Sequence, residues 1–121
     1  MPILDIEIVL RPGEQLVPDL ARRLALAAGT VLGSAPGETW VRLRGLPADQ
    51  YAENDGGQAL EVFPVFVSVL RADPAAPQTA DEPALLAEAV AARCGRPIEN
   101  THILYEPGAR GRIAFGGRLM T

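Results

Sequence analysis

The chain has 121 residues, of which 48% are hydrophobic and 5% aromatic; this size and composition predict a single domain over residues 1–121 and exclude a disordered chain. Its formal net charge is −4 and it has no basic stripe, which argues against nucleic acid and membrane partners. The single cysteine, the lack of a secretory signal and the lack of a bilayer-length apolar run predict a cytoplasmic protein.

The first half of the chain predicts a strand, a helix and a second strand. Apolar and acidic residues alternate over residues 4–10, the pattern of a half-buried strand. Leucine, alanine and valine recur at helical spacing over residues 20–32, and Gly33 is placed to end that helix. Residues 39–46 are again strand-like and stop at Pro47.

The second half follows the same order. Residues 62–71 form the most apolar predicted strand, and a connection rich in proline and alanine follows it. Asp81 is placed to cap a helix whose apolar stripe runs over residues 85–94. Residues 102–106 predict the last main strand, and residues 113–115 predict a short additional one.

This shared order predicts an internal repeat with an offset of 60 to 62 residues. The recurring landmarks are proline-led strands, helix-ending glycines, second strands and glycine pairs: Pro2 and Pro64, Gly33 and Gly95, residues 41–44 and 101–104, and residues 56–57 and 116–117. We predict two repeats, about 2–61 and 62–121. Right-handed βαβ crossovers then give an α/β (α+β) fold with a four-stranded sheet and both helices on one face. We expect oligomerisation to cover the other face.

The start Met1-Pro2, the duplicated βαβ unit and the glycine-rich end of each half resemble the tautomerase superfamily. Its members include 4-oxalocrotonate tautomerase, macrophage migration inhibitory factor and malonate semialdehyde decarboxylase. Residues 36–47 resemble their second strand, and residues 101–117 resemble the last strand and turn of the long members. The resemblance covers nearly the whole chain. It implies a homotrimer with a barrel-like core of three sheets and three active sites at subunit boundaries.

The resemblance makes Pro2 the central catalytic candidate. Removal of Met1 exposes a secondary amine, and an apolar pocket beside arginines disfavours its charged form through desolvation and like charge. The free amine can then take a proton alpha to a carbonyl and return it elsewhere without a cofactor. A chain that keeps Met1 has an amide nitrogen at Pro2 and no such base.

Two arginines are candidates to bind the carboxylate of a small substrate. Arg42 shares one predicted strand face with Trp40 and Arg44, which are further binding candidates. By resemblance, it falls where 4-oxalocrotonate tautomerase places a substrate-carboxylate arginine. Arg71 ends the most apolar strand and matches a substrate-binding arginine position of malonate semialdehyde decarboxylase. The alternatives are a solvated strand face and an ordinary strand end, and the sequence leaves open which arginine binds.

Three further side chains are candidates for proton transfer or hydrogen bonding. His102, the only histidine, is the repeat counterpart of Arg42 and by resemblance occupies the position of a pocket tyrosine in macrophage migration inhibitory factor. A partly buried structural histidine is the alternative. Tyr105 is a hydrogen-bond donor of the opposite strand parity. Glu38 falls near a water-activating or decarboxylation-assisting acid of the decarboxylase branch, or else is a solvated loop residue.

The sequence has no metal or nucleotide motif, and we expect no metal and no cofactor. Cys94 lies on an apolar helix stripe, which favours a packing thiol. We therefore predict a tautomerase, an isomerase of small 2-oxo acids or their enols. Two alternatives stay open. One is a decarboxylase, hydratase or dehalogenase of small unsaturated or 3-oxo acids on the same scaffold, and the other is a non-catalytic trimeric binding protein.

Overall fold

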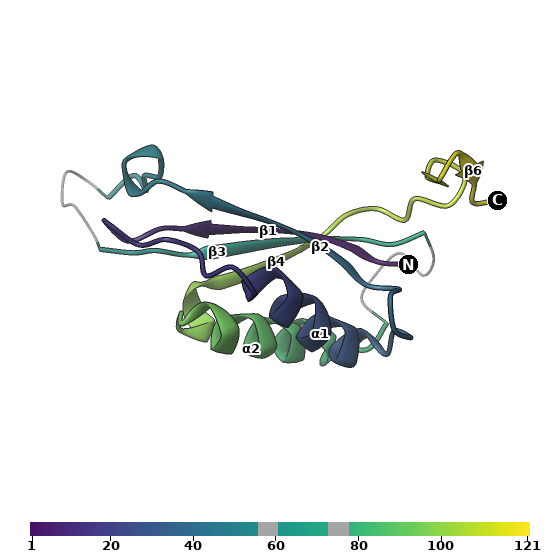
Figure 1. The fold of residues 1–121 in the computed structure, drawn as a ribbon, viewed down its shortest axis with the longest axis horizontal. Helices are drawn as coiled ribbons and strands as arrows, with labels where there is room; N and C mark the ends of the chain where they lie inside the picture. Colours follow the sequence, from purple (N-terminus) through teal and green to yellow (C-terminus); the bar gives the residue numbers. More distant parts are fainter. Residues whose placement is uncertain (56–60, 73–77) are drawn as a thin grey trace.

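The computed structural model describes residues 1–55, 61–72 and 78–121, and it shows one sheet with two helices packed on one of its faces (Figure 1). The main elements, in chain order, are β1 (Ile3–Val9), α1 (Leu20–Leu32), β2 (Trp40–Leu46), β3 (Val65–Leu70), α2 (Glu82–Cys94) and β4 (Thr101–Tyr105). The shorter elements are 3-10 helices at Ala48–Gln50 and Ile98–Asn100 and a hairpin of β5 (Ala114–Phe115) with β6 (Arg118–Leu119). The predicted four-stranded sheet with both helices on one face is confirmed.

The order of strands in the sheet is β2-β1-β3-β4. The outer strands pair in parallel with their inner neighbours, and β1 pairs antiparallel with β3. Each parallel pair with its helix is one βαβ unit, and the antiparallel pairing of β1 with β3 joins the two units. The start of β1 and the end of β3 therefore lie at the same end of the sheet.

Two strand predictions are corrected in their extent. The strand predicted over residues 62–71 is paired only over Val65–Leu70, because Pro64 has no N–H to donate to the ladder. The carbonyl of Pro64 instead accepts a hydrogen bond of 3.0 Å from the Val9 N–H. The short strand predicted over residues 113–115 is one arm of the β5–β6 hairpin, whose other arm the sequence did not predict. In Figure 1 this hairpin projects beyond the end of the sheet at which the chain begins.

The two helices end alike. Gly33 and Gly95 follow their last turns with φ of 66° and 65°, a left-handed conformation that glycine adopts without steric cost. The predicted C-cap at Gly33 is confirmed. Asp81 is the N-cap residue of α2, as predicted, but its carboxylate makes no capping hydrogen bond and accepts one of 2.7 Å from the Thr79 hydroxyl instead.

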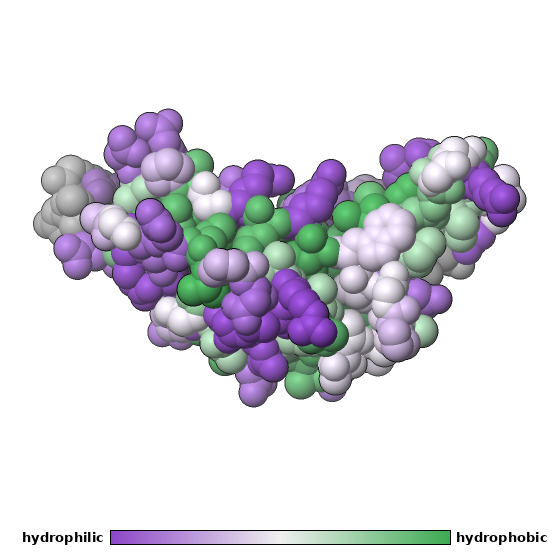
Figure 2. Space-filling view, viewed as in Figure 1, coloured by the Kyte–Doolittle hydropathy of each residue, from purple (hydrophilic) through white to green (hydrophobic). Residues whose placement is uncertain are grey.

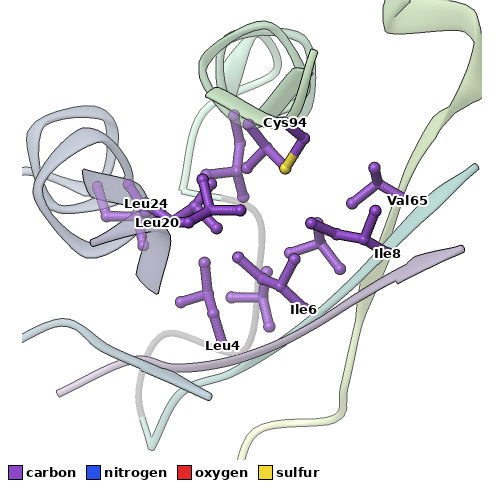
Figure 3. Packing of buried hydrophobic residues seen from close by; sticks show 13 residues of the cluster. Leu4, Ile6, Ile8, Leu20, Leu24, Val65 and Cys94 are labelled. Atoms are coloured by element: carbon purple, nitrogen blue, oxygen red, sulfur yellow. The ribbon is translucent and has the colours of Figure 1, made fainter. Parts of the chain in front are cut away.

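The core lies between the helices and the sheet (Figure 3). Its members are inward side chains of both helices and of the two central strands: Leu4, Ile6, Ile8, Leu20, Leu24, Ala28, Leu32, Val65, Val67, Val69, Leu86, Val90 and Cys94. Full burial of each large aliphatic side chain contributes about 1.5–3 kcal/mol. Cys94 is a buried packing thiol, as predicted, and burial raises its pKa to about 11.

A buried arginine, Arg96, stabilises the end of the sheet opposite Pro2 through its hydrogen bonds. Arg96, whose side chain is 1% exposed, donates to the backbone carbonyls of Val9, Phe63 and Cys94. Its guanidinium also donates to both carboxylate oxygens of Glu14, at 2.6 and 3.1 Å. Nε, Nη1 and Nη2 of this arginine therefore all have acceptors, which is how a purely structural buried guanidinium is satisfied.

Candidate functional site

The face of the sheet away from the helices is covered by no helix among the described residues. Because Leu4, Ile6 and Ile8 point into the core, the alternate residues of β1 point the other way. The exposed or half-buried side chains on this open face are Ile3, Asp5, Glu7, Trp40, Arg42, Arg44, Phe66, Ser68, Leu70, His102 and Leu104. Figure 2 shows the side of the molecule away from the helices hollowed between its two ends, with hydrophilic and hydrophobic side chains mixed.

A groove of about 620 Å³ lies on the open face, at the end of the sheet where β1 begins. It is lined by residues of three strands and of the segment after β4: Ile3, Asp5, Trp40, Arg42, Arg44, Ser68, Leu70, Glu106, Pro107 and Arg112. Its volume is in the range of small-molecule sites. Three predicted site residues, Trp40, Arg42 and Arg44, therefore lie together in it.

The two groove arginines on β2 face acidic residues on β1. Arg42 lies opposite Asp5 and donates to both of its carboxylate oxygens, at 2.6 and 2.8 Å. Hydrogen bonding from Arg42 holds the pKa of the Asp5 carboxyl below its usual value. Arg44 lies 3.7 Å from Glu7 in the same register. A ligand carboxylate would therefore have to compete with Asp5 for the guanidinium of Arg42, which is 69% exposed.

Trp40 forms one wall of the groove. Its indole N–H donates to the Gly37 carbonyl at 2.9 Å, and its ring meets the edge of Phe115 with the centroids 5.4 Å apart. The C-terminal hairpin is thereby held against the start of β2. Glu38 is exposed in the turn before β2 and is not among the described residues that line the groove.

Pro2 lies at the end of the sheet, one residue before β1. Its carbonyl accepts a hydrogen bond of 3.0 Å from the Trp40 N–H, and its side chain is buried. Ile3 pairs with Leu70 across the antiparallel ladder, so the same register sets Pro2 opposite Arg71. Extended by one residue, the register therefore places the backbones of two predicted site residues, Pro2 and Arg71, opposite each other at one end of the sheet. Met1 is present in the structure, so the nitrogen of Pro2 is an amide there.

Arg71 belongs to a buried polar cluster with Glu82 and Tyr105. The side chains of Arg71 and Glu82 are 5% and 4% exposed, and Arg71 Nη2 lies 2.5 Å from Glu82 Oε2. The Tyr105 hydroxyl donates to the same oxygen at 2.8 Å. Burial and the hydrogen bond to Glu82 raise the pKa of the Tyr105 hydroxyl, so this group keeps its proton and remains a donor.

One atom of this cluster lacks a partner. Arg71 Nε is buried and makes no hydrogen bond with any described residue, whereas every nitrogen of the Arg96 guanidinium has an acceptor. A buried donor without an acceptor costs about 1–3 kcal/mol. The contrast between the two buried arginines indicates that Arg71 is suited to receive an oxygen atom of a ligand, while Arg96 is structural.

His102 lies far from Pro2 within one chain. It pairs with Phe66 in the β3–β4 register, and the centroids of the two rings are 5.6 Å apart. Phe66 lies five positions before Arg71, which is about 16 Å along a strand. The structure therefore does not bring His102 into the cluster around Pro2 in a single chain.

The sequence did not single out Asp5 or Glu82 as site residues, although both bind predicted arginines. The only signal for Asp5 was its alternation in the first predicted strand. Among the described residues, no group of three or more His, Cys, Asp or Glu side chains could hold a metal ion. In the same part of the chain, no helix combines the length and apolar character needed to cross a membrane.

No protein-family model matches the sequence, and no curated protein matches it. The fold, however, is similar to solved structures over nearly the whole chain. It matches native fused 4-OT with 20% identity and a TM-score of 0.70, over 96% of this chain and 95% of that one. It matches macrophage migration inhibitory factor from Trichinella spiralis with 14% identity and a TM-score of 0.70, over 97% and 98%. It matches FG41 malonate semialdehyde decarboxylase with 15% identity and a TM-score of 0.63, over 94% and 88%. The chain therefore has the fold of the tautomerase superfamily, as its sequence predicted.

Proposed function

We propose that this protein is a member of the tautomerase superfamily and a cofactor-independent isomerase of small 2-oxo acids or their enols. Its base is the amine of Pro2, exposed when Met1 is removed. The observation that carries this proposal is Arg71, a buried guanidinium set opposite Pro2 by the strand register, with an Nε that has no acceptor among the described residues. A small carboxylate supplies the missing acceptor.

The reaction requires one group that transfers a proton and one group that binds the substrate carboxylate. Arg71 Nε donates a hydrogen bond to the substrate carboxylate and so holds the adjacent carbon beside Pro2. The neutral amine then takes a proton from one position of the enol or 2-oxo acid and returns it at another, with no net gain or loss of atoms. Anchoring the acid makes this transfer effectively intramolecular, which is the main contribution that a positioned arginine makes to the rate.

We also propose that the protein assembles as a homotrimer. The support is the open face of the sheet, which carries the exposed large side chains of Trp40, Phe66 and Leu104. In such an assembly the open face of one subunit meets another subunit. This contact is the route by which Arg42 or His102 would reach the Pro2 of a second chain.

A second candidate is decarboxylation or hydration of a small 3-oxo or unsaturated acid, with Pro2 acting in its protonated form. The ion pair of Arg71 with Glu82 favours it, because the carboxylate offsets the positive charge that would otherwise repel a protonated amine. The exposed position of Glu38 outside the groove gives no support to a water-activating role for this residue.

The test is an Arg71→Lys variant, which keeps the charge facing Glu82 but loses Nε and the planar fork. Its kcat/KM for ketonisation of an arylenolpyruvate should fall about 10- to 150-fold, the value of one hydrogen bond to a charged group. The methyl ester of the same substrate, which lacks the charge, should lose less than about threefold. Arg93→Lys, exposed on α2, is the control and should behave as wild type.

Two other results decide against the isomerase. Carbon dioxide release from malonate semialdehyde, with no ketonisation, would support the second candidate. The absence of both activities from protein shown by mass to lack Met1 would reject both reactions and leave a binding role.

A further inference from the structure

Glu82 touches no substrate in either reaction proposed for this site, yet it is one of the most buried charged groups in the described part of the chain. It is the first residue of α2 and points its carboxylate at Arg71 and Tyr105. Burial of a carboxylate is costly unless it is paired and hydrogen-bonded, so this side chain needs an explanation.

The hydrogen bonds fix the orientation of the Arg71 guanidinium. A single oxygen of Glu82 accepts from Arg71 Nη2 at 2.5 Å and from the Tyr105 hydroxyl at 2.8 Å. The central carbon of the guanidinium lies 5.9 Å from the centroid of the Tyr105 ring. Nη2 is thereby turned toward the start of α2, and Nε is left as the donor without an acceptor.

The same contact sets the charge beside Pro2. On the helix side of the sheet at this end, the ion pair among the described residues is that of Arg71 with Glu82, whose charges are opposite. On the open side and in the segment after β4, the described charged groups include Asp5, Glu7, Arg42, Arg44, Glu106, Arg110 and Arg112. Asp5 and Glu7 are paired with arginines there, and among the described residues Glu82 is the carboxylate that forms an ion pair with Arg71.

We propose that Glu82 is a positioning residue for the chemistry at Pro2: its carboxylate, held by Tyr105, orients the Arg71 guanidinium and offsets its charge beside the amine. This inference rests on the proposed function, because it requires a free amine at Pro2. Neutralising Glu82 leaves Arg71 uncompensated and disfavours a protonated amine. Neutralising Arg71 has the opposite effect. Shifts of opposite sign in the pKa of the Pro2 amine, in the Glu82 and Arg71 variants, indicate an electrostatic effect. A loss of structure in both variants would not produce shifts of opposite sign.

The experiment is a titration of the Pro2 amine in protein labelled with ¹⁵N-proline, after mass spectrometry has confirmed the loss of Met1. Only the terminal proline is an amine, so its ¹⁵N signal is separate from those of the other prolines. In Glu82→Gln the pKa of the amine should fall. As a scale for this effect, one unit charge about 6 Å from a titrating group shifts its pKa by about 0.5–2 units at an effective dielectric constant between about 80 and 20. In Arg71→Gln the pKa of the amine should rise.

The matched control is Glu88→Gln, the same change at an exposed position of the same helix, which should leave the titration as in wild type. If Glu82→Gln does not fold, the double variant Arg71→Gln/Glu82→Gln is compared with Arg71→Gln alone. Addition of the second change should lower the pKa of the amine. The acid limb of the kcat/KM profile for the arylenolpyruvate should move with the titration.

The titration does not depend on turnover, so the two proposals fail separately. A titration in Glu82→Gln that matches Glu88→Gln overturns the role of Glu82, even if ketonisation by Pro2 is found. A shift of the expected sign without ketonisation supports the role of Glu82 and counts against the isomerase. A chain that keeps Met1 has no amine to titrate and overturns both.

Discussion

Replacement of Arg96 by methionine tests how the fold is held at the end of the sheet opposite Pro2. This side chain makes five hydrogen bonds: to the carbonyls of Phe63 at 2.8 Å, Val9 at 2.9 Å and Cys94 at 3.1 Å, and to the two oxygens of Glu14 at 2.6 and 3.1 Å. Methionine fills much of the same space but provides no donor. All five bonds are lost, and Glu14 loses its buried partner.

The expected loss of stability is about 3–5 kcal/mol, the cost of breaking a buried ion pair by removing one member. Five bonds at about 1.5 kcal/mol each would give a larger sum. That sum is too high, because the Glu14 side chain is 28% exposed and regains water when Arg96 is removed. Since a domain of this size is stable by about 5–15 kcal/mol in total, this loss is a large fraction of the whole stability.

The measurement is urea unfolding at pH 7, followed by circular dichroism at one fixed protein concentration because any assembly adds to apparent stability. Arg93→Met is the control. Its arginine is exposed, its side chain donates a hydrogen bond of 3.4 Å to the Ala89 carbonyl, and the change should stay within about 0.5 kcal/mol. An Arg96→Met protein within about 1 kcal/mol of wild type would refute the reasoning.

Three further predictions follow from single residues. Leu24→Ala, at a core position with no exposed surface, should lower the free energy of unfolding by about 2–5 kcal/mol in the same urea assay. Cys94, whose pKa is raised to about 11 by burial, should resist iodoacetamide at pH 8 in the folded protein and react once the protein is unfolded, as read by mass. The pKa of Asp5 is lowered by Arg42, so this carboxylate stabilises the fold at pH values above its unfolded pKa and loses that contribution as the pH falls through its folded pKa. Asp5→Asn should therefore be less stable than wild type at pH 7, and this difference should shrink as the pH falls through the folded pKa of Asp5.

The fold could be predicted because its signals are local. Helical spacing over residues 20–32, a glycine where that helix ends and alternation in the first strand each depend on neighbours along the chain. The predictions that differ from the structure also concern short stretches of the chain. Asp81 has the right residue type for a cap, but Thr79, two positions away, binds its carboxylate instead of the helix N–H groups. The β5–β6 hairpin has arms of two residues each, too short for a periodic signal.

The site was predictable only in part, because its contacts depend on strand register and helix packing. The sequence singled out Arg71 as the end of an apolar strand, but Glu82 is its partner only because α2 begins beside that strand end. The sequence predicted that Arg42 and Trp40 share a face, because alternate residues of a strand point to the same side. The pairing of Arg42 with Asp5 depends instead on how β1 aligns with β2. The alternation of residues within one strand does not determine its register with a neighbouring strand.

The central claim is that the Pro2 amine performs the proton transfer. The most direct measurement follows the ketonisation of an arylenolpyruvate by wild type and Pro2→Ala, each shown by mass to lack Met1. Alanine keeps a primary amine at the same position, so the comparison tests the secondary amine and its placement. We predict clear catalysis by wild type and a loss of about 10²- to 10⁴-fold in Pro2→Ala. Equal rates in the two proteins, or catalysis by a chain that retains Met1, would contradict the account.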